Sequence, residues 1–196
     1  KAQVQKTAKL YGNAKSSTAQ YKFLTSSISI AAAGDYIDFP SSNDFGFSSR
    51  DFTVEVWVYW TGGAFSGGDS PGIVSFRDAV AAESTILYLD RSNGKFRVYD
   101  GPANTAYNSS SAISQNTWHH LALSRQGTTW RMFIDGTQGN TWTSSSDLGS
   151  SRRMLIGRLA NGTQYHWIGY ISDIRVTKGL ARYTSNFTPP TAALKG

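Results

Sequence analysis

Hydrophobic and polar residues alternate with a period of two along much of the chain, most regularly over residues 51–60. In this run the even-numbered positions are all apolar, and the odd-numbered positions after Asp51 are Thr53, Glu55, Trp57 and Tyr59. Successive residues of a strand point to opposite faces of its sheet, so both faces here carry large apolar groups. The pattern predicts a central strand that is covered on one face by a second sheet and lines a concavity on the other.

Two further alternating runs, Trp118–Arg125 and Trp130–Ile134, flank a turn that contains Gly127. The second run ends at Asp135-Gly136, and an Asp-Gly pair is a strong signal for a tight hairpin. These residues therefore predict a meander of antiparallel strands.

Shorter runs predict the remaining strands, at residues 21–24, 27–31, 36–39, 73–77, 85–90, 95–100, 138–143, 153–158 and 168–177. Residues 101–115 are expected to form a polar loop. No helix is expected beyond a single turn, which the sequence allows near residues 179–183. Many short strands at regular spacing predict an all-β, two-sheet antiparallel sandwich of the jelly-roll type with essentially no helix.

Composition supports the all-β prediction and narrows the chemistry. Aromatic residues make up 13% of the 196 residues and charged residues only 16%. The absence of cysteine excludes disulfides and thiolate metal sites. No apolar run approaches the length that spans a membrane, so no membrane partner is expected.

The net charge of +6 is concentrated at the start of the chain. Five lysines and no acidic residue lie in the first 22 residues, which leaves the remainder at +1. We expect residues 1–18 to form a basic N-terminal arm or linker and residues 19–196 to form the domain. Nucleic-acid binding is not expected, because it requires clustered basic residues on the folded surface.

Adjacent histidines at His119 and His120 suggest a metal site or acid–base chemistry at first sight. Neighbouring strand residues point to opposite faces, so the two side chains are poorly placed to bind one ion. We expect both to be structural, one of them buried with a hydrogen-bonded ring nitrogen.

Five segments occur in an order and spacing that resemble a laminin-G-like domain of the concanavalin A-like lectin/glucanase superfamily: residues 51–58, 116–125, 133–136, 156–158 and 169–176. The resemblance covers roughly residues 19–193. It implies a two-sheet jelly roll with a binding or structural role, not an enzyme.

The closing segment, residues 175–191, is similar to versions of this domain in virion proteins of tailed bacteriophages. This implies a non-enzymatic decoration, structural or tail-associated protein on the virion surface, held to other virion proteins by its N-terminal arm. The alternative is a carbohydrate-binding module of a secreted or cell-surface bacterial adhesin or polysaccharide-degrading enzyme. Homo-oligomerisation is compatible with both.

Catalysis by glucanase-like chemistry is not expected. Retaining glycoside hydrolysis needs two carboxyl groups about 5 Å apart. Glucanase relatives place acidic residues at alternate positions of one strand, whereas here Glu55 lies between Thr53 and Trp57. The other glutamate, Glu83, is expected in a loop. We therefore assign no catalytic residue.

Two sets of residues are candidates for binding. Aromatic rings at strand ends and loops can be exposed and stack on sugars, and the candidates are Tyr107, Trp130, Trp142, Tyr165 and Trp167. The alternative is that each of these rings covers a sheet edge. Asp173 resembles a position that holds one structural calcium in glucanase relatives, with backbone carbonyls near Gly34 or Asp51 as its partners. The alternative for Asp173 is a salt bridge or a capped turn. No other cofactor is expected.

Overall fold

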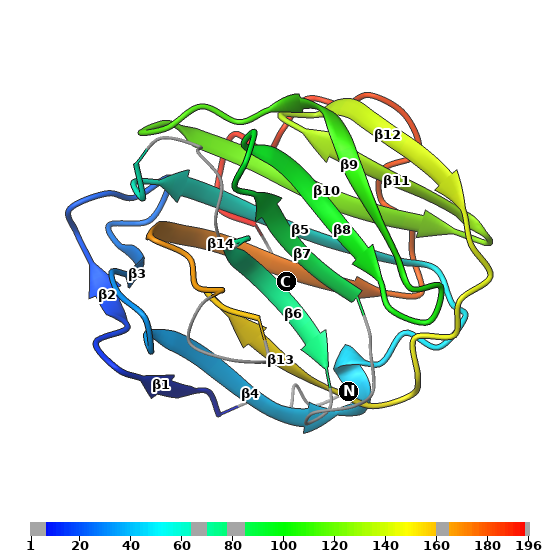
Figure 1. Cartoon of the computed structure of the whole chain (residues 1–196), viewed down its shortest axis with the longest axis horizontal. Helices are drawn as coiled ribbons and strands as arrows, with labels where there is room; N and C mark the ends of the chain where they lie inside the picture. Colours follow the sequence, from blue (N-terminus) through cyan, green and yellow to red (C-terminus); the bar gives the residue numbers. More distant parts are fainter. Residues whose placement is uncertain (1–6, 64–69, 78–84, 160–164, 195–196) are drawn as a thin grey trace.

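Two antiparallel sheets of seven strands each pack face to face (Figure 1). The computed structural model describes residues 7–63, 70–77, 85–159 and 165–194. Sheet A contains, in spatial order, β1 (Lys9–Tyr11), β4 (Tyr36–Ser42), β13 (Arg152–Ile156), β6 (Gly72–Arg77), β7 (Thr85–Asp90), β8 (Lys95–Asp100) and β9 (Thr105–Ala112). Sheet B contains β12 (Thr137–Thr143), β11 (Thr129–Ile134), β10 (Trp118–Gln126), β5 (Phe52–Trp60), β14 (Gly169–Lys178), β3 (Ser27–Ile30) and β2 (Lys15–Ser17). The predicted all-β sandwich is confirmed.

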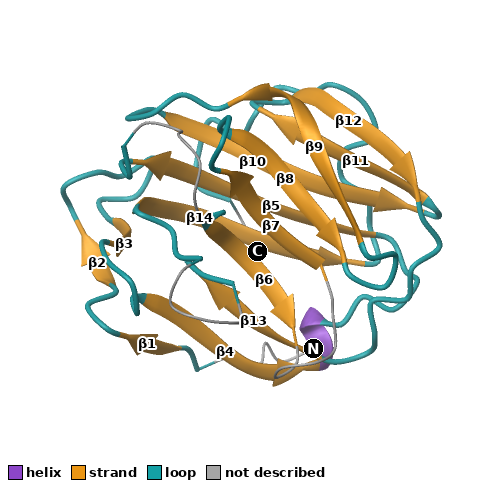
Figure 2. Ribbon diagram, viewed as in Figure 1, coloured by secondary structure: helices purple, strands orange, loops and turns teal. Residues whose placement is uncertain are grey.

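Helix is confined, within the described residues, to the single 3-10 turn η1 (Asn43–Phe45), the purple element of Figure 2. No helical turn forms at 179–183, where the sequence allows one, because that segment is irregular and is held by contacts with sheet B instead. None of the helices in the described part of the chain is long and apolar enough to span a membrane.

The core lies between the inner faces of the two sheets. The even-numbered residues of β5, from Phe52 to Trp60, are all 0% exposed and belong to it. β5 pairs with β10 on one side and β14 on the other, which confirms its predicted central position. Its odd-numbered residues therefore point to the outer face of sheet B.

Two predictions for individual segments are wrong, one for a loop and one for a strand. Residues 101–115, expected to be a loop, include the edge strand β9, which has a largely polar sequence because it pairs with β8 alone in sheet A. Residues 21–24, expected to be a strand, pair with neither sheet. There Phe23 packs edge-on against Trp57, with ring centroids 5.6 Å apart, on the outer face of sheet B.

The segment expected to be an arm instead contributes an edge strand to each sheet. β1 pairs with β4 in sheet A, and β2 pairs with β3 in sheet B. Between them, the Asn13 N–H donates to Asp35 Oδ1 at 2.7 Å. The domain boundary expected at residue 19 is therefore wrong for residues 9–17, because β1 and β2 belong to the two sheets. Residues 1–6 lie outside the described residues.

We predict that deleting residues 1–18 destabilises the domain. The deletion removes two edge strands, the bond to Asp35 and the stacking of Tyr11 on Tyr36. Together these contacts should contribute at least about 2 kcal/mol, which shifts the melting temperature by about 4–8 °C in a domain of this size. Thermal unfolding followed by circular dichroism measures the shift. Deleting residues 1–6 alone is the control, and equal melting temperatures for both deletions would contradict the strand assignment.

Candidate functional site

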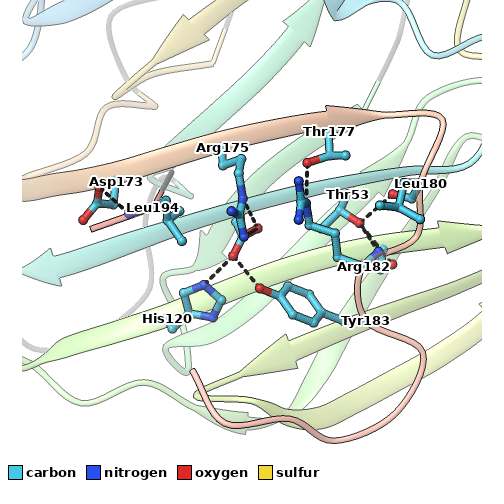
Figure 3. A network of polar contacts seen from close by, with 11 residues as sticks. Thr53, His120, Asp173, Arg175, Thr177, Leu180, Arg182, Tyr183 and Leu194 are labelled. Carbon is cyan, nitrogen blue, oxygen red and sulfur yellow. Dashed lines mark hydrogen bonds and ion pairs between the residues drawn. The ribbon is translucent and has the colours of Figure 1, made fainter. Parts of the chain in front are cut away.

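The outer face of sheet B carries a buried charge at Glu55, which is 0% exposed. Arg175 on β14 donates from Nε and Nη2 to Glu55 Oε1, at 2.8 and 2.7 Å. The other oxygen, Oε2, accepts from the Tyr183 hydroxyl at 2.7 Å and from His120 Nε2 on β10 at 3.2 Å (Figure 3). Both carboxylate oxygens are thus hydrogen-bonded, and the negative charge is matched by the guanidinium.

The pKa of Glu55 reflects this balance. Burial acts to raise the pKa, but hydrogen bonds from His120, Tyr183 and Arg175 outweigh burial and hold the pKa below its ordinary value. The same environment raises the pKa of Tyr183 to about 12, first through burial and then through its bond to the Glu55 carboxylate. Glu55 is therefore ionised and Tyr183 is neutral at physiological pH.

Tyr183 belongs to the C-terminal strap, which we define as residues 180–194 and which is drawn in orange-red to red in Figure 1. The first residues of the strap are bound to Thr53 on β5. The Thr53 hydroxyl donates to the Leu180 carbonyl at 3.0 Å and accepts from the Arg182 N–H at 2.8 Å. Farther along, the Phe187 N–H donates to the Gly136 carbonyl at 2.9 Å. The strap therefore crosses the outer face of sheet B from β5 to the β11–β12 turn.

Aromatic packing holds the strap over the charge network. The rings of Tyr183 and Phe187 stack at 3.6 Å, and both lie edge-on to Phe133 and His120. Gly136 makes this approach possible: its φ is +77°, and a Cβ there would lie 1.9 Å from the Phe187 carbonyl oxygen. The strap fills the middle of the concavity that the β5 pattern predicts.

The partners of Glu55 are unsuited to glycoside hydrolysis. They are an arginine, a neutral tyrosine and a histidine, whereas the reaction needs a second carboxyl group. The other glutamate, Glu83, lies outside the described residues. Glu55 links β5 to β10, β14 and the strap, and its carboxylate is buried away from solvent.

The two adjacent histidines face opposite sides of β10, as the alternation predicts. His120 contacts Glu55, whereas His119 Nδ1 donates to Asp135 Oδ2 at 2.7 Å. His119 Nε2 accepts from the Ser114 N–H at 3.1 Å. Burial acts to raise the pKa of Asp135, but bonds from His119 and the His120 N–H outweigh it and lower the pKa. Both histidines hold turns and strands together.

At one end of the same face, three aromatic rings lie side by side on neighbouring strands. We call Trp118 on β10, Tyr59 on β5 and Tyr170 on β14 the aromatic row; they occupy one register position across the sheet. Ring centroids are 5.5 Å apart for Tyr59 and Trp118, and 5.9 Å apart for Tyr59 and Tyr170. All three residues are half-buried, so each ring retains accessible surface.

Polar groups flank the aromatic row. A cavity of about 210 Å³ beside Tyr170 is lined in part by Ser29 and Thr61. The Lys22 ammonium lies 4.0 Å from the ring centroid of Trp57, which is itself only 5% exposed. The row therefore combines accessible rings with nearby hydroxyl groups, the combination that sugar recognition requires.

Sequence reasoning did not select the aromatic row, although its signal was present. The alternation in β5 placed Tyr59 on the outer face, and the pairing of β10 with β5 brings Trp118 beside it. Finding the row required the strand register, which the sequence did not provide.

The expected exposure of the tryptophans chosen from the sequence is wrong. Trp130 and Trp167 are 0% exposed and Trp142 is 8% exposed, because all three rings face the core. Trp142 also stacks on Tyr107 at 4.2 Å where β9 and β12 close one side of the sandwich. Tyr107 and Tyr165 are half-buried, on different elements from the aromatic row, and a glycan role for them stays a prediction.

Asp173 lies at a bulge of β14, between residues that pair with Trp57 and Glu55. Its Oδ1 accepts from the Leu194 N–H at 3.4 Å, and burial raises its pKa. Calcium takes six to eight oxygen ligands, most of them carboxylates and carbonyls. Asp35 and Asp51 bind backbone N–H groups instead, and within the described residues no three His, Asp or Glu gather to hold a metal. This surrounding does not fit calcium, and we derive no role for one.

The profile of the concanavalin A-like lectin/glucanases superfamily (Laminin_G_3) matches residues 31–181. The chain therefore belongs to this superfamily. A comparison with curated proteins finds no match.

Solved structures show the same fold at low sequence identity. Domain 4 of a GH43 extracellular arabinanase from Geobacillus stearothermophilus, in complex with arabinotriose, is 16% identical with a TM-score of 0.65, over 90% of this chain and 83% of that one. A putative carbohydrate-binding protein from Bacteroides ovatus is 16% identical with a TM-score of 0.53, over 92% and 45%. The binding domain of botulinum neurotoxin serotype D is 12% identical with a TM-score of 0.66, over 90% and 44%.

We predict that the Glu55 network contributes strongly to stability. Glu55→Gln leaves the half-buried Arg175 guanidinium without its matching charge and should lower the free energy of unfolding by about 3 kcal/mol. Tyr183→Phe removes one hydrogen bond to a charged group and should lower it by about 2 kcal/mol. Urea unfolding measures both. Tyr107→Phe, which keeps its ring stacking, is the control and should change stability by about 0.5 kcal/mol or less.

The same variants provide a pH test. Because the pKa of Glu55 is lowered on folding, its stabilising effect is complete above the ordinary value of 4.5 and is lost as the pH falls through the folded-state pKa. The stability difference between wild type and Glu55→Gln should therefore shrink in acid. A difference that stays constant with pH would contradict the ionised network.

Proposed function

We propose that this chain is a non-catalytic carbohydrate-binding module whose aromatic row stacks on sugar rings. The observation that carries the proposal is the register of Trp118, Tyr59 and Tyr170, which sets three accessible rings side by side on rigid neighbouring strands. Aromatic rings on rigid strands bind with little loss of side-chain freedom. The arabinanase domain in complex with arabinotriose shows a fold of this kind beside a sugar ligand, and this supports the proposal.

A neutral oligosaccharide fits the row best. The three side chains carry no charge, and the neighbouring Ser29 and Thr61 supply hydroxyl groups. The ring centroids lie 5.5 and 5.9 Å apart along the row, and the ring planes are inclined by 56° and 74°. The sealing of Glu55 by the strap accounts for binding without cleavage.

We predict that truncating the aromatic row abolishes glycan binding. Trp118→Ala and Tyr59→Ala should each weaken binding at least about tenfold, because a truncated aromatic anchor loses about 2 kcal/mol or more. Arabinotriose titrated calorimetrically, alongside a neutral-glycan array, measures the effect. Tyr99→Ala, which removes a half-buried tyrosine from sheet A, is the matched control, and melting curves establish that each variant is folded. Binding that survives both truncations, or no binding to any glycan, would contradict the proposal.

The finer assignment places the module on the surface of a tailed-bacteriophage virion, as a decoration or tail-associated protein. Its support is the resemblance of the closing segment, residues 175–191, to versions of this domain in virion proteins. The alternative, a module of a secreted or cell-surface bacterial protein, shares the same binding row.

The virion assignment predicts that the chain copurifies with intact particles. Peptides of the chain should appear by mass spectrometry in the particle band of a density gradient. A chain found only in the soluble fraction would contradict this assignment, while leaving the sugar-binding proposal to its own test.

A further inference from the structure

One side of the sandwich is lined by two cavities. β3 pairs with β14 only over Gly169–Ile171, so beyond Ile171 the strand β14 pairs with β5 alone among the described strands. β4 and β13 of sheet A face this part of β14 across the sandwich. Two cavities of about 330 and 420 Å³ lie here, and Ile28 and Asp173 line both of them.

Apart from Asp173 and, in the first cavity, Lys15 and four serines, the residues that line these cavities are apolar. Ile37 and Ile171 line the first, and Phe39, Met154 and Ile156 line the second. The first cavity is also lined by Leu10 and Leu24, which are 57% and 60% exposed and rank among the most exposed large apolar side chains of the described chain. An apolar cavity with an exposed apolar rim is typical of a site that receives a ligand.

A single carboxylate is set into these walls. Asp173 has a φ of +48° at the bulge of β14, a left-handed conformation that is uncommon outside glycine but that aspartate adopts more readily than most residues. Bulges re-aim side chains and are common beside functional sites. Oδ1 accepts from the Leu194 N–H (Figure 3), whereas Oδ2 is buried with no hydrogen-bond partner among the described residues.

A buried carboxylate oxygen without a partner is costly, and a donor that reached it would remove that cost. Burial raises the pKa of Asp173, and the Leu194 N–H and the Arg175 guanidinium only partly offset that rise. A positively charged donor matches the carboxylate best, because a charge-assisted hydrogen bond is about twice as strong as a neutral one. The same charge disfavours an anionic ligand in the second cavity, whose lining within the described chain includes Asp173 and no basic residue.

We propose that the two cavities bind a small apolar molecule that carries one cationic amine, with its apolar body between β14 and β4–β13 and its amine at the Asp173 carboxylate, whose buried Oδ2 turns toward the cavity on binding. Their volumes fall in the usual range for small-molecule sites. The site is separate from the aromatic row, because it is lined by core-facing residues such as Ile37 and Ile171, not by the outer face of sheet B.

The test compares three eight-carbon probes that differ only in their polar end: n-octylamine, 1-octanol and octanoate. Calorimetric titration of the full chain at neutral pH should show octylamine binding at least about tenfold more tightly than octanol, with octanoate weakest. Chemical shift changes in NMR spectra should centre on Ile28, Ile171 and Asp173. Equal affinity for the three probes, or no binding of octylamine, would overturn the proposal.

Two variants separate the charge from the cavity. Asp173→Asn should remove the preference for octylamine and leave octanol binding unchanged, whereas Asp147→Asn, at an exposed aspartate in the 144–151 loop, should change neither. Ile28→Trp should fill both cavities and weaken all three probes, with melting curves establishing that it is folded. A preference for octylamine that survives Asp173→Asn would overturn the assigned role of the carboxylate.

Discussion

The buried carboxylate of Glu55 is the constraint on which the rest of sheet B depends. A charge at a position that is 0% exposed is tolerated only with a matching charge and hydrogen bonds to both oxygens. Its partners come from β14, β10 and the C-terminal strap, which are up to 128 residues away in sequence. One side chain therefore fixes two neighbouring strands and holds the strap across their outer face.

The strap divides the outer face into two parts with different consequences. Around Glu55 the face is sealed by Tyr183 and Phe187, which leaves the carboxylate without access to a substrate. At the end of the same strands the aromatic row remains accessible. The superfamily includes glucanases, but in this chain the central acidic residue, Glu55, has a structural role. The accessible aromatic surface of the same sheet is the aromatic row.

Alternation in the sequence was sufficient to predict the central strands, because β5 and β10 are long and their faces differ in polarity. It was insufficient for β9, a polar edge strand, and for β1 and β2, whose three-residue strands show too little pattern. It also misplaced Trp130 and Trp167, since ends of strands in a sandwich can still face the core. The Glu55 network and the aromatic row depend on register between strands, and a single sequence does not determine register.

The most direct test of the Glu55 network is the titration of Tyr183 in the folded protein. Selective carbon-13 labelling of the tyrosine Cζ atoms, with Tyr183→Phe to assign the resonance, gives the pKa of this hydroxyl. Burial and the bond to Glu55 predict titration at about 12, above the ordinary value of 10.0. Titration of Tyr183 near 10 in a folded chain would show that its hydroxyl is not held by a buried carboxylate and would contradict the account.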